Sequence, residues 1–214
     1  ELEFGGQVHN RLRQEMTTVR QIRSSGEREL IIFDIDDTLF HTTAQISVLD
    51  TDGKVMRTLT NQQFNTFKLP AGWSFDFGEF RNAKIFAKES TPIKPMINRL
   101  KKLMVDSPSA RFVFLTAREN FDDKALFLDT FKKQGIDMSR VFVHRAGNLT
   151  GGAIPALKVK IVSGHLDSRA YDKVQLFDDA PANLKAFLKM RKTYKWVTFT
   201  AFLVKANGSV KQIK

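Results

Sequence analysis

Four apolar residues, Leu30-Ile31-Ile32-Phe33, lead directly into three carboxylates within four positions, Asp34, Asp36 and Asp37. A short apolar run bounded by polar residues predicts a buried strand, so the carboxylates would lie at its carboxyl end. Open parallel α/β sheets bind ligands at that edge. Like charges this close repel one another unless a cation lies among them, and carboxylate oxygens suit Mg²⁺. The segment therefore predicts a metal-dependent phosphoryl-transfer site.

The remainder of the chain alternates short apolar runs with amphipathic segments. Further strands are predicted over residues 110–115, 141–143, 174–177 and 196–204, and helices over residues 92–105, 120–134, 156–169 and 181–191. Strands that alternate with helices are typical of a parallel sheet with right-handed crossovers. The sequence therefore predicts an α/β fold with a doubly wound parallel sheet.

An insertion interrupts this alternation at about residues 41–92. Asp52-Gly53 separates two strand-like runs, Ile46–Asp50 and Val55–Leu59, which predicts a β-hairpin. The irregular stretch that follows is too short for an independent domain and predicts a small cap over the strand ends. Its aromatic residues are Phe64, Phe67, Trp73, Phe75, Phe77, Phe80 and Phe86. Two roles stay open for these side chains, stacking on a base or sugar and burial as the core of the cap, and we favour burial.

Composition narrows the classes to which the chain can belong. Its 214 residues suffice for one α/β domain, placed at residues 29–214, behind an N-terminal helix or tail at residues 1–28. The absence of cysteine excludes disulfides, thiol catalysis and zinc sites built from cysteine. No apolar run is long enough for a transmembrane helix and no signal peptide is visible, so a cytoplasmic protein without a membrane partner is expected.

The acidic segment also resembles a known motif. Asp34-Ile35-Asp36-Asp37-Thr38 is similar to the first motif of the haloacid dehalogenase (HAD) superfamily, and Thr116, Lys158 and Asp178-Asp179 follow in the order of the family's other motifs. The resemblance extends over roughly residues 30–190. It implies a Rossmann-like HAD core with a β-hairpin flap and a small cap insertion.

The resemblance implies a role for most of the matched residues. Asp34 would attack phosphorus to form an aspartyl-phosphate, and Asp36 would protonate the leaving oxygen and then activate water. Thr116 would donate its hydroxyl to the phosphoryl oxygens. Asp37 stands where many members of the family carry glycine, and it has no assigned role.

The family's third motif is a lysine that neutralises the nucleophile and the phosphate, and two lysines compete for that position. Counting from Lys158, Ile161 and Val162 fall at the third and fourth places of a helix and give this lysine a buried neighbourhood. From Lys160 the same places hold Ser163 and Gly164. We therefore favour Lys158, and Lys160 remains the alternative.

The resemblance also implies a Mg²⁺ site. Asp178 would bind the ion directly. Asp179 would act through a water molecule or by contacting the residues that bind the ion. Asp34 and the backbone carbonyl of Asp36 would complete the set. The ion would bridge the carboxylates and the phosphoryl group.

The formal net charge of +11 favours a phosphorylated or polyanionic partner. Residues 180–214 contain eight Lys or Arg residues and no Asp or Glu. In layout the chain is similar to the phosphatase half of polynucleotide kinase/phosphatases. The hypothesis is a Mg²⁺-dependent phosphatase whose substrate is a nucleotide, a nucleic-acid end or a small metabolite. The alternative is a catalytically silent HAD-fold module that binds nucleic acid or a protein through its basic surface.

Overall fold

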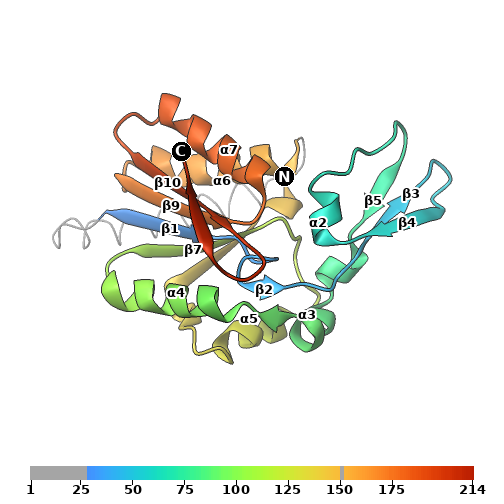
Figure 1. Cartoon of the computed structure of the whole chain (residues 1–214), viewed down its shortest axis with the longest axis horizontal. Coiled ribbons are helices and arrows are strands. Elements are labelled where there is room, and N and C mark those ends of the chain that lie inside the picture. Colours follow the sequence, from blue (N-terminus) through green and yellow to red (C-terminus); the bar gives the residue numbers. More distant parts are fainter. Residues whose placement is uncertain (1–27, 150–151) are drawn as a thin grey trace.

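A computed structural model describes residues 28–149 and 152–214. The N-terminal helix or tail predicted at residues 1–28 lies outside the described residues, apart from Arg28. The described chain forms a mixed α/β structure around a six-stranded sheet with strand order β11-β10-β9-β1-β7-β8 (Figure 1). These strands are β1 (Glu29–Phe33), β7 (Arg111–Thr116), β8 (Val141–Arg145), β9 (Lys173–Asp178), β10 (Thr198–Val204) and β11 (Val210–Ile213).

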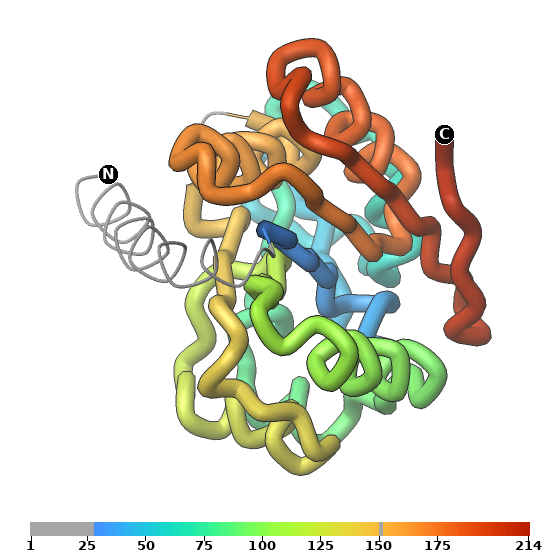
Figure 2. Tube along the Cα trace, turned by 90° about the vertical axis from the view of Figure 1, so that its left-hand side faces the viewer, coloured from blue at the N-terminus to red at the C-terminus, as the bar shows by residue number. Residues whose placement is uncertain are grey.

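Strands β1, β7, β8, β9 and β10 run parallel to one another, as the sequence predicts. The sixth strand, β11, pairs antiparallel with β10 and was not predicted. A turn at Gly208, whose φ of 81° suits glycine, joins the two strands. Figure 2 shows this C-terminal hairpin at one side of the molecule and β1 near the middle.

Helices cover both faces of the sheet. One face carries α6 (Ile154–Asp167) and α7 (Pro181–Lys189), and the other carries α4 (Lys94–Asp106) and α5 (Lys124–Lys132). Short 3₁₀ turns occupy Met138–Arg140, Ala146–Asn148 and Met190–Lys192.

Burial on both faces explains why β1 is apolar throughout. Leu30 and Ile32 point into the core under α6 and α7, whereas Ile31 and Phe33 point into the core under α4 and α5. All four side chains are completely buried. A strand covered on both faces needs a continuous apolar run instead of alternation, which is what the sequence has.

The predicted helices form, with shifted ends. The largest shift is in α5, which begins at Lys124 and not at residue 120. The cause is Asp123, whose carboxylate accepts a hydrogen bond from the backbone N–H of Leu126 at 3.0 Å and so begins the helix. Gly135, with φ of 78°, follows its C-terminal end.

The insertion contains more regular structure than the sequence predicts. Its elements are β2 (Phe40–His41), β3 (Ile46–Leu49), β4 (Val55–Leu59), α2 (Asn61–Phe64), β5 (Ser74–Asp76), a 3₁₀ turn (Gly78–Arg81), α3 (Ala83–Glu89) and β6 (Thr91–Pro92). The predicted β3–β4 hairpin is confirmed, with φ of 78° at Gly53. Both β5, which pairs with β3, and α3 fall in the stretch predicted to be irregular.

The insertion has a small apolar core of its own. Ile46, Val48, Leu59 and Phe80 are buried there, and partly buried aromatic side chains pack around them: Phe64, Phe67, Trp73, Phe75 and Phe77. The aromatic residues thus serve as the core of the insertion, as favoured from the sequence. Phe86 is different, because it is buried in the main core beside Phe40 and Phe131.

The order of the strands creates a crevice at their carboxyl ends. From β1 the chain proceeds outward through β7 and β8, and then returns to the other side of β1 to form β9 and β10. Connections therefore diverge between β1 and β9, and ligands of open α/β sheets bind at such a point. In Figure 1 the small sheet and α2 of the insertion lie beside this end of the large sheet. Within residues 28–149 and 152–214 no helix is long and apolar enough to cross a membrane.

Candidate active site

Three carboxylates from two adjacent strands meet in this crevice. Ligand oxygens of Asp34, Asp178 and Asp179 lie within 4.8 Å of one another. Parallel pairing of β1 with β9 brings them together, because Phe33 is in register with Phe177 and the aspartates follow directly. Asp34 and Asp178 are buried, at 5% and 0% exposure, whereas Asp179 is partly exposed.

Lys158 lies between two of these carboxylates. Its Nζ is 2.8 Å from Oδ1 of Asp34 and 2.9 Å from Oδ2 of Asp178. Helix α6 points Lys158 toward the strand ends on the same side as the buried Ile161 and Val162. Lys160, the alternative from the sequence, is exposed to solvent.

The carboxylate of Asp178 also accepts hydrogen bonds from the segment that follows it in the chain. The backbone N–H of Ala180 donates to its Oδ1 at 2.9 Å, and Nδ2 of Asn183 donates to Oδ2 at 3.0 Å. The hydroxyl of Thr38 donates to Asp34 at 3.3 Å. These bonds fix the orientation of both carboxylates relative to Lys158. Asn183 was not predicted, although it lies in the first turn of the helix that follows the Asp178-Asp179 pair.

If all three carboxylates of the cluster were ionised, they would carry more negative charge than Lys158 neutralises. Burial raises the pKa of Asp34 to about 7, and the neighbouring carboxylates of Asp178 and Asp36 add to the rise although Lys158 opposes it. Burial also raises the pKa of Asp179 to about 10, together with the charges of Asp34 and Asp178. Burial by itself would lower the pKa of Lys158, but the carboxylates of Asp178 and Asp34 outweigh burial and raise it, so the charged form of the lysine is favoured. Three carboxylates this close together could hold a metal ion, whose charge would favour their ionised forms.

Protons and a cation should compete for this cluster. Because Asp34 and Asp179 have raised pKa values, binding of Mg²⁺ should release protons and tighten as the pH rises from 6 to 8. The dissociation constant should fall roughly 10-fold per pH unit for each proton displaced. Calorimetric titration with Mg²⁺ in buffers of different ionisation enthalpy measures both quantities. An affinity that is equal at pH 6 and pH 8 would contradict this site.

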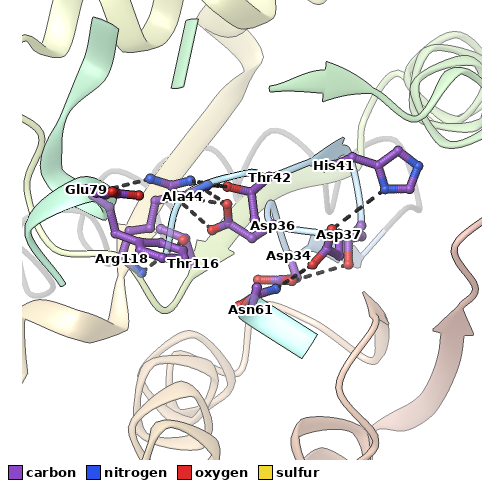
Figure 3. Close-up of polar contacts among 12 residues, drawn as sticks. Asp34, Asp36, Asp37, His41, Thr42, Ala44, Asn61, Glu79, Thr116 and Arg118 are labelled. Atoms are coloured by element: carbon purple, nitrogen blue, oxygen red, sulfur yellow. Dashed lines mark hydrogen bonds and ion pairs between the residues drawn. The ribbon is translucent and has the colours of Figure 1, made fainter. Parts of the chain in front are cut away.

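Asp36 does not join the cluster, because Arg118 holds its carboxylate elsewhere (Figure 3). Nε of Arg118 lies 2.8 Å from Oδ2 of Asp36, and Nη2 lies 2.6 Å from Oδ1. The pair is buried, with exposures of 2% and 6%. Arg118 also donates to the carbonyl of Phe80 at 2.9 Å and to the hydroxyl of Thr42 at 3.2 Å, so it ties the insertion to the core.

The sequence patterns did not predict a role for Arg118, yet a signal was present. It follows Thr116 by two residues at the same strand end. Thr116 itself is completely buried at the end of β7, where its hydroxyl accepts a hydrogen bond from the backbone N–H of Arg118 at 3.0 Å. In the described structure the threonine therefore braces the turn that presents Arg118.

Asp37 contacts the insertion. Its φ of 60° is in the left-handed region, and its Oδ2 accepts hydrogen bonds from Asn61 at 2.8 Å and from Gln62 at 3.2 Å. The same amide of Gln62 donates to Oδ2 of Asp179 at 3.0 Å. Helix α2 is thus connected to the acidic cluster through Gln62, which bonds both Asp37 and Asp179. Nδ1 of His41 lies 3.7 Å from Oδ1 of Asp37 (Figure 3).

The loop after β8 approaches the loop after β7 so closely that only glycine fits. A Cβ atom at Gly147 would lie 2.3 Å from the carbonyl oxygen of Ala117. Nearby, Asn120 and Asn148 exchange two hydrogen bonds of 2.9 Å. These contacts position the turn that contains Arg118.

The arrangement combines groups that suit phosphoryl transfer: a carboxylate at the end of the central strand, an ammonium beside it and a second pair of carboxylates that suit a cation. Asp34, Lys158 and Asp179 line a cavity between the sheet and the insertion, and Thr116 is not among the residues that line it. No protein-family model matches the sequence, and no curated protein matches it either.

Proposed function

We propose that this chain is a Mg²⁺-dependent phosphatase of the HAD type, which hydrolyses a phosphomonoester through an aspartyl-phosphate intermediate. The observation that carries the proposal is the contact of Lys158 with both Asp34 and Asp178 at the carboxyl ends of adjacent strands. A nucleophilic carboxylate needs a nearby positive charge to approach an anionic phosphate. The domain is residues 29–214, with the β3–β4 hairpin as the flap and the rest of the insertion as a small cap.

In the first half-reaction an oxygen of Asp34 attacks phosphorus and the bond to the leaving oxygen breaks, while Asp36 protonates that oxygen. In the second, Asp36 accepts a proton from the water that attacks the aspartyl-phosphate, which releases inorganic phosphate and restores Asp34. Lys158 offsets the negative charge of nucleophile and phosphate throughout. When bound by Asp34, Asp178 and Asp179 with the backbone carbonyl of Asp36, Mg²⁺ would stabilise the charge of the transferred phosphoryl group.

Proton transfer through Asp36 has a structural requirement. Both of its oxygens accept hydrogen bonds from Arg118. At least one of these bonds must break before the carboxyl group can reach a leaving oxygen. We therefore assign Arg118 as a positioning residue that holds Asp36 between turnovers.

Hydrolysis of p-nitrophenyl phosphate tests the proposal. Release of nitrophenol should require Mg²⁺ and stop with EDTA. Asp34→Asn should reduce kcat by at least about 10³-fold, because the amide is not a nucleophile toward phosphorus. Asp129→Asn is the matched control, since Asp129 is on α5 in an ion pair with the exposed Lys133. Equal rates for wild type and Asp34→Asn would reject the proposal.

The buried Asp36–Arg118 pair also favours one alternative. If that pair never opens, the chain is a catalytically silent HAD-fold module, with the basic residues of its surface left to bind nucleic acid or a protein. Such a module would bind Mg²⁺ at the acidic cluster and release no phosphate from any ester in the assay above.

A further inference from the structure

The cavity beside the acidic cluster is much larger than a phosphate group requires. Its volume is about 710 Å³, which lies within the range of small-molecule sites. Asp34, Lys158 and Asp179 lie in its wall. Most of the space therefore remains for the group that carries the phosphate.

The insertion supplies an aromatic wall to this cavity. Phe64, Phe75, Phe77 and Phe80 all line it. The rings pack edge to face. The ring centroid of Phe64 lies 5.0 Å from that of Phe75 and 5.5 Å from that of Phe77, and the centroids of Phe77 and Phe80 are 6.4 Å apart. Because these rings are held by the core of the insertion, the wall exists before a ligand enters.

The opposite wall is apolar as well. It is formed by side chains of the core domain: Leu149, Ile154, Pro155, Leu157 and Pro181. An organic group between the two walls would contact apolar atoms on both sides. The polar side chains of Asn61, Asn65, Thr66 and Asn183 also line the cavity, but a hydrated sugar between the two walls would meet mostly apolar atoms and would not regain all of its hydrogen bonds.

The basic surplus of the chain is not concentrated in this cavity. Four acidic residues and three basic residues line it. Arg118 is paired with Asp36, and Arg81 lies 3.0 Å from Glu119. Recognition of a nucleic-acid backbone uses cations that are available to phosphates. The cavity therefore favours a small ester over a nucleic-acid end.

We propose that this cavity binds the organic group of a small phosphomonoester, and that this group carries a planar aromatic ring. The inference rests on the proposed phosphatase function and deepens it by naming the substrate class. The phosphate would lie at the end formed by Asp34 and Lys158, and the ring would pack against the wall that contains Phe77. Aromatic rings gain favourable edge and face contacts beyond their burial, which selects them over aliphatic polyols.

A substrate panel tests the inference. With Mg²⁺, kcat/KM should be at least about 10-fold higher for naphthyl phosphate than for glycerol phosphate or glucose phosphate. A nucleoside monophosphate and a phosphorylated oligonucleotide complete the panel. They distinguish a single nucleotide from a nucleic-acid polymer as the substrate. Equal kcat/KM for naphthyl and glycerol phosphates would overturn the inference while leaving the phosphatase intact. Preference for the oligonucleotide, lost as salt increases, would overturn it in favour of a nucleic-acid substrate.

Two phenylalanines provide a matched pair of variants. Phe77→Ala should lower kcat/KM for naphthyl phosphate about 10-fold and change that for glycerol phosphate less than about twofold. Phe67 belongs to the same aromatic cluster, but its ring does not line the cavity. Phe67→Ala should therefore preserve the preference for naphthyl phosphate over glycerol phosphate. Phe77→Leu keeps most of the side-chain volume and replaces Phe77→Ala if that variant unfolds. Equal losses for both substrates in Phe77→Leu would overturn the inference.

Binding without turnover gives an independent measurement. Fluorescence titration of Asp34→Asn with naphthyl phosphate should show saturable binding that Phe77→Leu weakens several-fold and Phe67→Ala does not. If wild type hydrolyses no ester, the proposed phosphatase fails, and this titration still decides whether the cavity accepts an aromatic ester. No saturable binding, or equal weakening by Phe67→Ala and Phe77→Leu, would overturn the inference.

Discussion

Arg118→Ala is expected to lower the free energy of unfolding by about 3–5 kcal/mol. The guanidinium is buried, and both oxygens of Asp36 accept its hydrogen bonds at 2.6 to 3.1 Å. Removing it leaves a buried carboxylate without its partner and also removes the bond to the carbonyl of Phe80. Urea unfolding followed by circular dichroism measures the loss.

Arg81→Ala is the matched control. Arg81 also pairs with a carboxylate from another segment, Glu119 at 3.0 Å, but its side chain is 48% exposed. Exposed ion pairs contribute less than about 1 kcal/mol, so the free energy of unfolding of this variant should be close to that of wild type. Adding Asp36→Asn to Arg118→Ala should recover part of the loss, because the unpaired charge disappears. Equal losses for the two arginine variants would show that the Asp36–Arg118 pair does not hold the insertion on the core.

Asp34→Asn is expected to stabilise the protein in the absence of Mg²⁺, even though it abolishes the proposed activity. Burial and neighbouring carboxylates raise the pKa of Asp34 from 3.8 to about 7. The folded state therefore binds a proton that the unfolded state releases, and this group destabilises the fold increasingly as the pH rises from about 4 to 7. The full rise corresponds to at most about 4 kcal/mol above pH 7. Asparagine removes that contribution.

Thermal unfolding at two pH values measures the effect. At pH 8 without Mg²⁺ the variant should melt several degrees above wild type. At pH 5 the difference should be smaller, because it grows only as the pH rises from about 4, where Asp34 is protonated in both states, to about 7. Added Mg²⁺ should raise the melting temperature of wild type more than that of the variant. A variant that melts below wild type at pH 8 without Mg²⁺ would mean that the bond to Lys158 outweighs the repulsion within the cluster.

Local sequence patterns determined the scaffold of this protein and the positions of its acidic residues. The apolar run Leu30-Ile31-Ile32-Phe33 predicts a strand buried on both faces, and alternation of strands with helices predicts parallel pairing. Parallel pairing alone places Asp34 and Asp178 at one edge. Helical periodicity predicted that Lys158, and not Lys160, lies on the buried side of its helix, because a helix packed on a sheet has only one buried side.

Only the tertiary structure decided which side chains these residues contact. Arg118 is 82 residues from Asp36, and Gln62 is 117 residues from Asp179. No periodic pattern relates such positions, since their distance depends on how the insertion packs against the core. The same packing forms the aromatic wall of the cavity from residues that the sequence shows only as an apolar cluster. Periodicity reports which side of an element is buried, whereas the partner of a buried charge is set by segments distant in sequence that fold against it.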